Sequence, residues 1–287
     1  MSELLAPGAR LEKLWTGTAW GEGPTWLPRT ESLVWSDIPN NRVLEYFATT
    51  GEVRVRHQPA EFANGRTLDL EGEIVQASHG RRAIERDVDG VVTTLVDNWA
   101  GGRFNSPNDL VVAGDGSIWF TDPPYGLHES GAEGHPGTQD YDGCYVFRWD
   151  PATDRTQPVI TDMIHPNGLA FSPDEELLYV AETAWFWKPE IAPTIRVYDL
   201  GTGVGRVFAE PSGVADGFRV DTEGRIWTSC GASVRVYSPD AEVLLDIPVP
   251  ERVGNLCFGG PDGTDVYLAA GTSLYRIATT ARQAPRG

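Results

Sequence analysis

Five oxygen-bearing side chains recur at matching positions along the 287-residue chain: Glu22, Asn64, Asn108, Asn167 and Asp216. Carboxylate and amide oxygens are the ligands that hard divalent cations prefer. Two carboxylates held close together also repel each other, and a cation between them removes that repulsion. The residue types therefore predict a metal site, provided that the fold brings the five positions together.

The five side chains belong to a repeated sequence pattern that occurs six times. Each copy has a short polar start, an apolar strand, a Gly/Asp/Pro turn and a second strand, and most copies are followed by two more strand-like runs. The copies are EGPTWLPRTESLVWS (22–36), ANGRTLDLEGEIVQAS (63–78), PNDLVVAGDGSIWFTD (107–122), HPNGLAFSPDEELLYVAET (165–183), ADGFRVDTEGRIWTS (215–229) and GNLCFGGPDGTDVYLAA (254–270). A unit of roughly 40–50 residues with four strands has the size of a propeller blade.

We therefore predict an all-β fold, a six-bladed β-propeller that residues 1–287 form as a single domain. The blades are expected to begin near residues 22, 64, 108, 167, 216 and 254. The sixth unit ends before its fourth strand, whereas LEKLW (11–15) precedes the first unit without a unit of its own. We expect this N-terminal strand to close the last blade, which leaves no open edge. A β-sandwich is the alternative, but it needs no shared residue at one position of every hairpin.

In a propeller the innermost strand of each blade lines the central channel. The five repeated side chains are therefore expected to meet at one mouth of that channel. A ring without Cys or His favours calcium first and magnesium or manganese next, with zinc less favoured. The alternative is a polar plug in which the same side chains only hydrogen-bond to one another.

Four further residues are expected near the ring. Arg103 and Asn105 closely precede Asn108, and Arg103 would either hold an anionic or hydroxyl-rich substrate or pair with Asp122. Asp122 and His79 follow the second strands of their units, where they are expected to border the mouth. His79 is a candidate for a contact with substrate or with a metal ligand.

The third unit contains an insertion at residues 121–143, TDPPYGLHESGAEGHPGTQDYDG. A long segment without regular structure in a compact domain is usually functional or disordered. We expect a lid or pocket wall, because the insertion starts at the mouth. Three adjacent aromatic residues, Trp185 to Trp187, are expected to contribute to the same wall and lid, and a dimer contact is the alternative.

The amino-acid composition excludes some classes of partner and indicates the cellular compartment. With 23 basic and 41 acidic residues the formal charge is −18, which argues against nucleic acid and anionic membranes as partners. The three cysteines are far apart and form no C-x-x-C pattern. The sequence shows neither signal-peptide blocks nor an apolar run of about 18 residues. We expect a cytoplasmic location, and the sequence gives no indication of oligomeric state.

The motifs together resemble one family. WGEGPTW, RFNSPNDLVV, GSIWFTDPPYG, HPNGLAFSPD, ADGFRVDTEGRIW and CFGGPDGTDVYLA resemble, in order and from about residue 15 to 280, the SMP-30/gluconolactonase/luciferin-regenerating-enzyme family, and in particular its bacterial gluconolactonase-like branch. The resemblance implies a six-bladed propeller with one divalent metal ion held by Glu22, Asn108, Asn167 and Asp216. It also implies substrate contacts from Arg103 and Asn105 and a role for Asp122.

Three functions are consistent with these residues. The first is a metal-dependent lactonase that opens a sugar lactone to the aldonic acid by attack of water, with Asp216 as the first choice of base and Asp122 as the second. In that reading Asn64 and His79 contact the substrate. The second is hydrolysis of an organophosphate or another ester at the same site. The third is a non-catalytic calcium-binding propeller.

Overall fold

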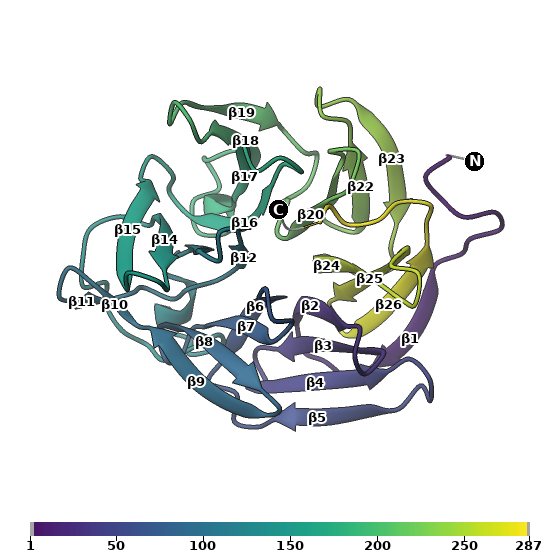
Figure 1. Ribbon diagram of the computed structural model, residues 1–287, viewed down its shortest axis with the longest axis horizontal. Helices are drawn as coiled ribbons and strands as arrows, with labels where there is room; N and C mark the ends of the chain where they lie inside the picture. The colour runs from purple at the N-terminus through teal and green to yellow at the C-terminus, as the bar shows by residue number, and fades with distance from the viewer. Residues whose placement is uncertain (1–2, 286–287) are drawn as a thin grey trace.

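Six antiparallel sheets of four strands each surround a central axis in the computed structural model, which describes residues 3–285 (Figure 1). Blade I comprises β2 (Gly21–Leu27), β3 (Ser32–Asp37), β4 (Arg42–Phe47) and β5 (Val53–His57). Blade II comprises β6 (Ala63–Leu68), β7 (Ile74–Ser78), β8 (Ala83–Val88) and β9 (Val91–Val96). Blade III comprises β12 (Leu110–Val112), β13 (Ile118–Thr121), β14 (Val146–Asp150) and β15 (Arg155–Ile160).

Blade IV comprises β16 (Pro166–Phe171), β17 (Leu177–Glu182), β18 (Thr194–Asp199) and β19 (Gly205–Ala209). Blade V comprises β20 (Phe218–Val220), β21 (Ile226–Ser229), β22 (Ser233–Tyr237) and β23 (Val243–Pro248). Blade VI comprises β24 (Val253–Gly259), β25 (Asp265–Ala270), β26 (Ser273–Ala278) and β1 (Glu12–Thr16). A small hairpin of β10 (Asn98–Trp99) and β11 (Gly102–Arg103) stands outside the blades.

The predicted fold class is confirmed. The inner strands begin within two residues of the positions that the repeat indicates, and the strand-like runs 42–47 and 273–278 coincide with β4 and β26. Within residues 3–285 the helical segments are two single-turn 3₁₀ helices, η1 (Tyr125–Leu127) and η2 (Ala184–Phe186). No helix of this part of the chain has the length and apolar character needed to span a membrane.

The N-terminal strand closes the ring, as predicted. β1 is the outermost strand of blade VI and pairs antiparallel with β26, where Trp15 lies opposite Leu274 and Thr16 opposite Ser273. Leu4, upstream of β1, is buried in the core between blades V and VI. The two ends of the chain therefore complete one sheet together, and the outer edge of β26 is covered (Figure 1).

The hydrophobic core is divided into six clusters, one in each gap between neighbouring blades. The aromatic residues of the second strands fill these gaps: Trp35, Phe120, Trp227 and Tyr267 are each no more than 1% exposed. Burying an aromatic side chain of this size contributes on the order of 3 kcal/mol. The contacts that stabilise the ring are thus mainly contacts between blades.

The inner strands also touch one another directly at the axis. A glycine follows the repeated polar residue in several blades, and its amide hydrogen-bonds to the next blade: Gly65 N donates to Asn108 O (2.8 Å) and Gly168 N to Asp216 O (2.9 Å). A Cβ on Gly168 would lie 2.2 Å from Asp216 O. Only glycine permits this approach without a shift of the backbone.

Asp109 and Asn255 occupy the glycine position in blades III and VI, which face each other across the ring. Asn255 Nδ2 donates to Asp109 Oδ2 (3.2 Å), and both residues are buried. The Asn255 side chain has room for this contact because Gly217 has no Cβ, and an added Cβ there would lie 2.0 Å from the Asn255 side chain. The Asp109–Asn255 hydrogen bond spans the channel next to the polar ring, and we call this pair the axial bridge.

Deletion of residues 1–16 should destabilise the protein by more than about 3 kcal/mol, because it unpairs β26 and uncovers part of the core. The free energy of unfolding in guanidinium chloride would measure the loss. The matched control is Glu12→Gln, which breaks only the Arg276–Glu12 ion pair at 2.6 Å and should cost less than about 1 kcal/mol. Equal stability of the truncated and full chains would contradict the closing role of β1.

Candidate active site

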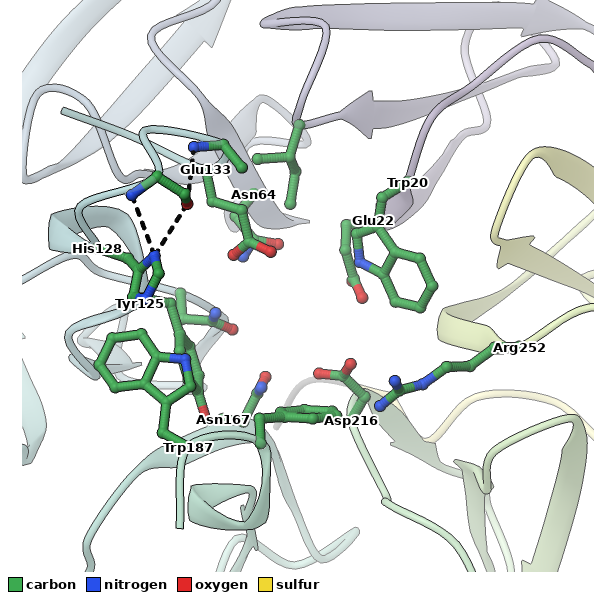
Figure 2. Close-up of a pocket in the computed structure, with 15 residues that line it drawn as sticks. Trp20, Glu22, Asn64, Tyr125, His128, Glu133, Asn167, Trp187, Asp216 and Arg252 are labelled. Carbon is green, nitrogen blue, oxygen red and sulfur yellow. Dashed lines mark hydrogen bonds between the residues drawn. The ribbon is translucent and has the colours of Figure 1, made fainter. Parts of the chain in front are cut away.

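A cavity of about 330 Å³ opens at one mouth of the channel (Figure 2). Its size suits a small organic ligand. Residues from inner strands form its base, and loops above them form its wall. The lining consists of Trp20, Glu22, Ile38, Asn64, Asn108, Tyr125, His128, Ser130, Ala132, Glu133, Asn167, Phe186, Trp187, Asp216 and Arg252.

The structure brings together all five side chains of the polar ring in this cavity. They come from the inner ends of blades I to V, and none is more than 8% exposed: Glu22, Asn64, Asn108, Asn167 and Asp216. Figure 2 shows the Glu22 and Asp216 carboxylates and the Asn167 amide directed toward a common centre. The repeat thus converges on one small space, as the sequence predicts.

The three amide side chains are held by their nitrogen atoms. Asn64 Nδ2 and Asn108 Nδ2 lie 3.2 Å and 3.5 Å from His79 Nε2, while His79 Nδ1 donates to the carbonyl of Glu133 (2.8 Å). This tautomer leaves Nε2 as an acceptor for both amides. Burial lowers the pKa of His79 to about 4, which keeps the ring neutral.

Asn167 is held in the same way, because its Nδ2 donates to Thr183 Oγ1 (3.2 Å). With their nitrogens engaged by the protein, the amides of Asn64, Asn108 and Asn167 retain free oxygens. Amide oxygens presented in this manner can act only as acceptors or as ligands of a cation. His79 does not line the cavity, but it orients two residues that do.

Burial and neighbouring negative charges disfavour the ionised forms of the two carboxylates in the ring, Glu22 and Asp216. Burial, together with the charge of Asp216, raises the pKa of Glu22 well above its usual value. Burial likewise raises the pKa of Asp216 to about 7, with Arg252 acting in the opposite direction and Glu133 adding to the rise. Glu22 Oε1 is buried without a hydrogen-bond partner and packs against Gly254, where an added Cβ would lie 2.2 Å away.

These features fit a divalent cation. A cation would satisfy the unpartnered Glu22 oxygen, offset the mutual repulsion of Glu22 and Asp216, and take the free amide oxygens as further ligands. Within residues 3–285 no three His, Cys, Asp or Glu side chains form a cluster that could hold a metal. The asparagine oxygens are therefore needed to complete any ligand set here, which favours a hard ion.

Two of the residues expected to contact substrate lie away from the cavity. Arg103 is exposed on β11, and its guanidinium donates to the carbonyl of Arg81 (2.8 Å). Asn105 is fully buried, and its Nδ2 donates to the carbonyls of Asp122 (3.0 Å) and Gly143 (3.1 Å). The Arg103 side chain thus reaches blade II and the Asn105 side chain reaches the insertion, and neither residue lines the cavity.

Asp122 also lies outside the cavity lining. Its Oδ2 accepts the backbone N–H of Asn105 (2.7 Å) and the hydroxyl of Tyr141. Asp37 and Glu182 occupy the corresponding strand ends in blades I and IV and do the same, accepting the backbone N–H of Ala19 (2.8 Å) and His165 (2.9 Å) respectively. These acids fix the segments that lead into the inner strands.

The structure adds wall residues that the motifs did not identify. Tyr125, His128 and Glu133 come from the insertion 121–143. The expectation for the aromatic triplet is confirmed for Phe186 and Trp187, which line the cavity, whereas Trp185 is 42% exposed and does not line it. The length of the insertion indicated a wall, but not which side chains would form it. Trp187 packs edge-to-face on Tyr125 (5.2 Å between centroids), which joins the two loops.

The sequence motifs also did not identify Trp20 and Arg252, which line the cavity. Each stands two residues before the repeated position of its blade, Glu22 in blade I and Gly254 in blade VI. That shared offset was the available signal. Arg252 is the arginine that lines the cavity, and its guanidinium faces the rings of Phe186 and Trp20.

Fold and site together define a six-bladed propeller with an oxygen-lined pocket at one end of its channel. A family model described as the SMP-30/Gluconolactonase/LRE-like region matches residues 20–272. The chain belongs to this family, as the motifs indicated.

Named relatives agree with this assignment. A gluconolactonase of Zymomonas mobilis is 30% identical, over 97% of this chain and 84% of the relative. The pentonolactonase XacC of Haloferax volcanii is 30% identical, over 86% of this chain and 80% of the relative. The solved structure of a gluconolactonase from Xanthomonas campestris superposes with a TM-score of 0.89 at 39% identity, covering 96% of this chain and 91% of that chain.

Glu22→Gln should stabilise the protein stripped of divalent ions by about 1 kcal/mol at pH 8, because it removes one of two buried, mutually repelling carboxylates. The same variant should lose most of the increase in Tm that a divalent ion gives the native sequence. Thermal unfolding with EDTA and with added calcium would measure both effects. An unchanged ion-induced increase in Tm would show that Glu22 is not a ligand.

Asp122 should make stability depend on pH. Burial raises its pKa from 3.8 to about 7, so the folded protein binds this proton more tightly than the unfolded chain does. The free energy of unfolding should therefore fall by a few kcal/mol as the pH rises from about 4 to about 7, with no further change from this residue above that range. Asp122→Asn should flatten this part of the curve in denaturant titrations, and superimposable curves would contradict the prediction.

Proposed function

We propose that the protein is a metal-dependent hydrolase that opens a sugar lactone of the gluconolactone type to the aldonic acid. The observation that carries the proposal is the convergence of two stressed carboxylates and three oriented amide oxygens in a small cavity. Membership of the family supports the class of reaction, because relatives at 30% and 39% identity are named as gluconolactonases.

The residues that would hold the cation in this proposal are Glu22, Asn108, Asn167 and Asp216. Calcium is the proposed ion, because all the ligand atoms are oxygens, and magnesium, manganese and zinc are the alternatives. When bound, a divalent cation supplies Lewis-acid polarisation of the lactone carbonyl and stabilises the negative charge that develops on its oxygen. Asn64 remains free to contact the substrate, since its amide nitrogen is engaged by His79 and its oxygen is available.

Asp216 is the base in this mechanism. It lines the cavity, and burial raises its pKa to about 7, so its carboxylate accepts a proton more readily than an exposed aspartate does. It takes a proton from the attacking water as the new C–O bond forms, and it returns that proton to the ring oxygen when the lactone C–O bond breaks. Asp122 is unsuited to the step, because it does not line the cavity and its Oδ2 accepts hydrogen bonds from the Asn105 N–H and the Tyr141 hydroxyl.

The walls of the cavity bind and orient the sugar ring. Tyr125 and Trp187 form one aromatic side, and Trp20 and Phe186 lie on the side of Arg252. Aromatic faces of this kind pack on the C–H surfaces of a sugar and exclude bulk water. Holding the lactone against the polar ring would contribute to the rate by orientation alone.

The test is hydrolysis of D-glucono-1,5-lactone, followed by acid release, after EDTA treatment and with calcium, magnesium, manganese or zinc added back. We expect one ion to restore turnover. Asp216→Asn should then lower kcat at least about 100-fold, because it removes the base and weakens ion binding, whereas Asp122→Asn should lower kcat less than tenfold.

A larger loss of kcat for Asp122→Asn than for Asp216→Asn, at equal folded fractions, would reverse the assignment of the base. Ion binding without turnover of this or any other sugar lactone would contradict the lactonase proposal. Turnover of aryl esters or organophosphates in that case would indicate an esterase on the same site, and no turnover at all would indicate a calcium-binding propeller.

A further inference from the structure

Arg252 has an unusual position on the cavity wall. It lies in the segment that enters β24, and its guanidinium carbon is 4.4 Å from the ring centroid of Phe186 and 5.5 Å from that of Trp20. Figure 2 shows the guanidinium directed into the cavity toward Asp216. Residues from three loops, in blades I, IV and VI, therefore place the Arg252 guanidinium at the cavity.

Among residues 3–285 the Arg252 side chain makes no hydrogen bond and no ion pair, and its charge acts on Asp216 of the same cavity without direct contact. Two arginines nearer the surface pair with carboxylates, Arg235 with Asp246 (2.9 Å) and Arg276 with Glu12 (2.6 Å), whereas Arg252 lies against aromatic rings at the cavity. A partly buried cation without a hydrogen-bonding partner is costly in the free protein. A partner supplied by the ligand would remove that cost.

The geometry of the contact specifies the kind of partner. A guanidinium that lies against aromatic faces keeps its N–H groups free at its edge. That edge forms two parallel hydrogen bonds with a carboxylate, a match that a lysine would not provide. Phe186 and Trp20 also restrict the side chain, so less conformational freedom is lost when the partner binds.

The charges around the cavity limit the partner further. A divalent cation at the ring offsets Glu22 and Asp216, which leaves Arg252 as the remaining positive group of the lining. Glu133 lines the same cavity, so a dianionic phosphate would meet more repulsion than a singly charged carboxylate. One additional negative charge on the substrate therefore suits the pocket best.

We propose that Arg252 binds a second, free carboxylate of the substrate, so that the preferred substrates are lactones of sugar diacids rather than neutral sugar lactones. One carboxyl group of such a diacid forms the lactone that is opened at the polar ring, and the other pairs with the guanidinium. This inference rests on the proposed lactonase function, because it assigns the substrate class of that same site.

The experiment compares two lactones of equal ring size, D-glucaro-1,4-lactone with a free carboxylate and D-glucono-1,4-lactone with a hydroxymethyl group in its place. With the activating ion present, kcat/KM of the native sequence should be at least tenfold higher for the glucarolactone, mainly through a lower KM. Arg252→Gln should reduce this ratio at least tenfold, and Arg252→Lys should give an intermediate ratio. The control Arg155→Gln removes an exposed charge on β15 and should leave the ratio as it was.

Titration calorimetry provides a readout that needs no turnover. The native sequence should bind D-glucarate at least tenfold more tightly than D-gluconate, and Arg252→Gln should lose this difference while keeping the Tm of the native sequence. A ratio near one for the native sequence, or an unchanged ratio in Arg252→Gln, would overturn the inference. If neither lactone is turned over, the proposed function fails, and the calorimetric preference alone decides whether Arg252 recognises a carboxylate.

Discussion

The close approach of the inner strands at the axis is the constraint on which the rest of the molecule depends. Gly65 and Gly168 donate from one blade to the backbone of the next, at places where a Cβ would collide with the neighbouring carbonyl. The axis is therefore closed by backbone, and the side chains immediately before these glycines must turn toward the mouth. A ring of polar groups at one end of the channel follows from this geometry.

The same crowding explains why the polar ring is electrostatically stressed. Its carboxylates are packed among amides and glycines, with the axial bridge of Asp109 and Asn255 beside them and little access for water. Burial thus raises the pKa of both Glu22 and Asp216. Such an arrangement lowers the stability of the free protein and is typical of sites that are completed by a ligand.

Sequence reasoning located the fold and the polar ring because both are encoded by a repeated position. Residues at one position of each repeat must share one environment, so the convergence of Asn64, Asn108 and Asn167 could be inferred without coordinates. Asp122 shows the limit of that reasoning. A polar residue at a strand end can face a cavity or cap a backbone N–H, and the repeat does not specify which direction the side chain takes.

The wall of the cavity could not be predicted in the same way. Arg252 and Glu133 lie in loops whose lengths differ from blade to blade, and their meeting depends on how those loops pack over the mouth. Arg103 was assigned to the site from its motif, but the hairpin that carries it turns toward Arg81 and Asp140 instead. The geometry of the polar ring alone therefore says little about which substrate is selected.

The sixth blade has a consequence for how the protein is made. Five sheets consist of consecutive strands and can form while the chain is still being synthesised, since each is complete once its own residues have left the ribosome. β1 is synthesised first but has no partner until β26 appears, and Glu12 and Arg276 meet across 264 positions. The nascent chain must therefore keep β1 unpaired until β26 has been synthesised, and the ring becomes complete only then.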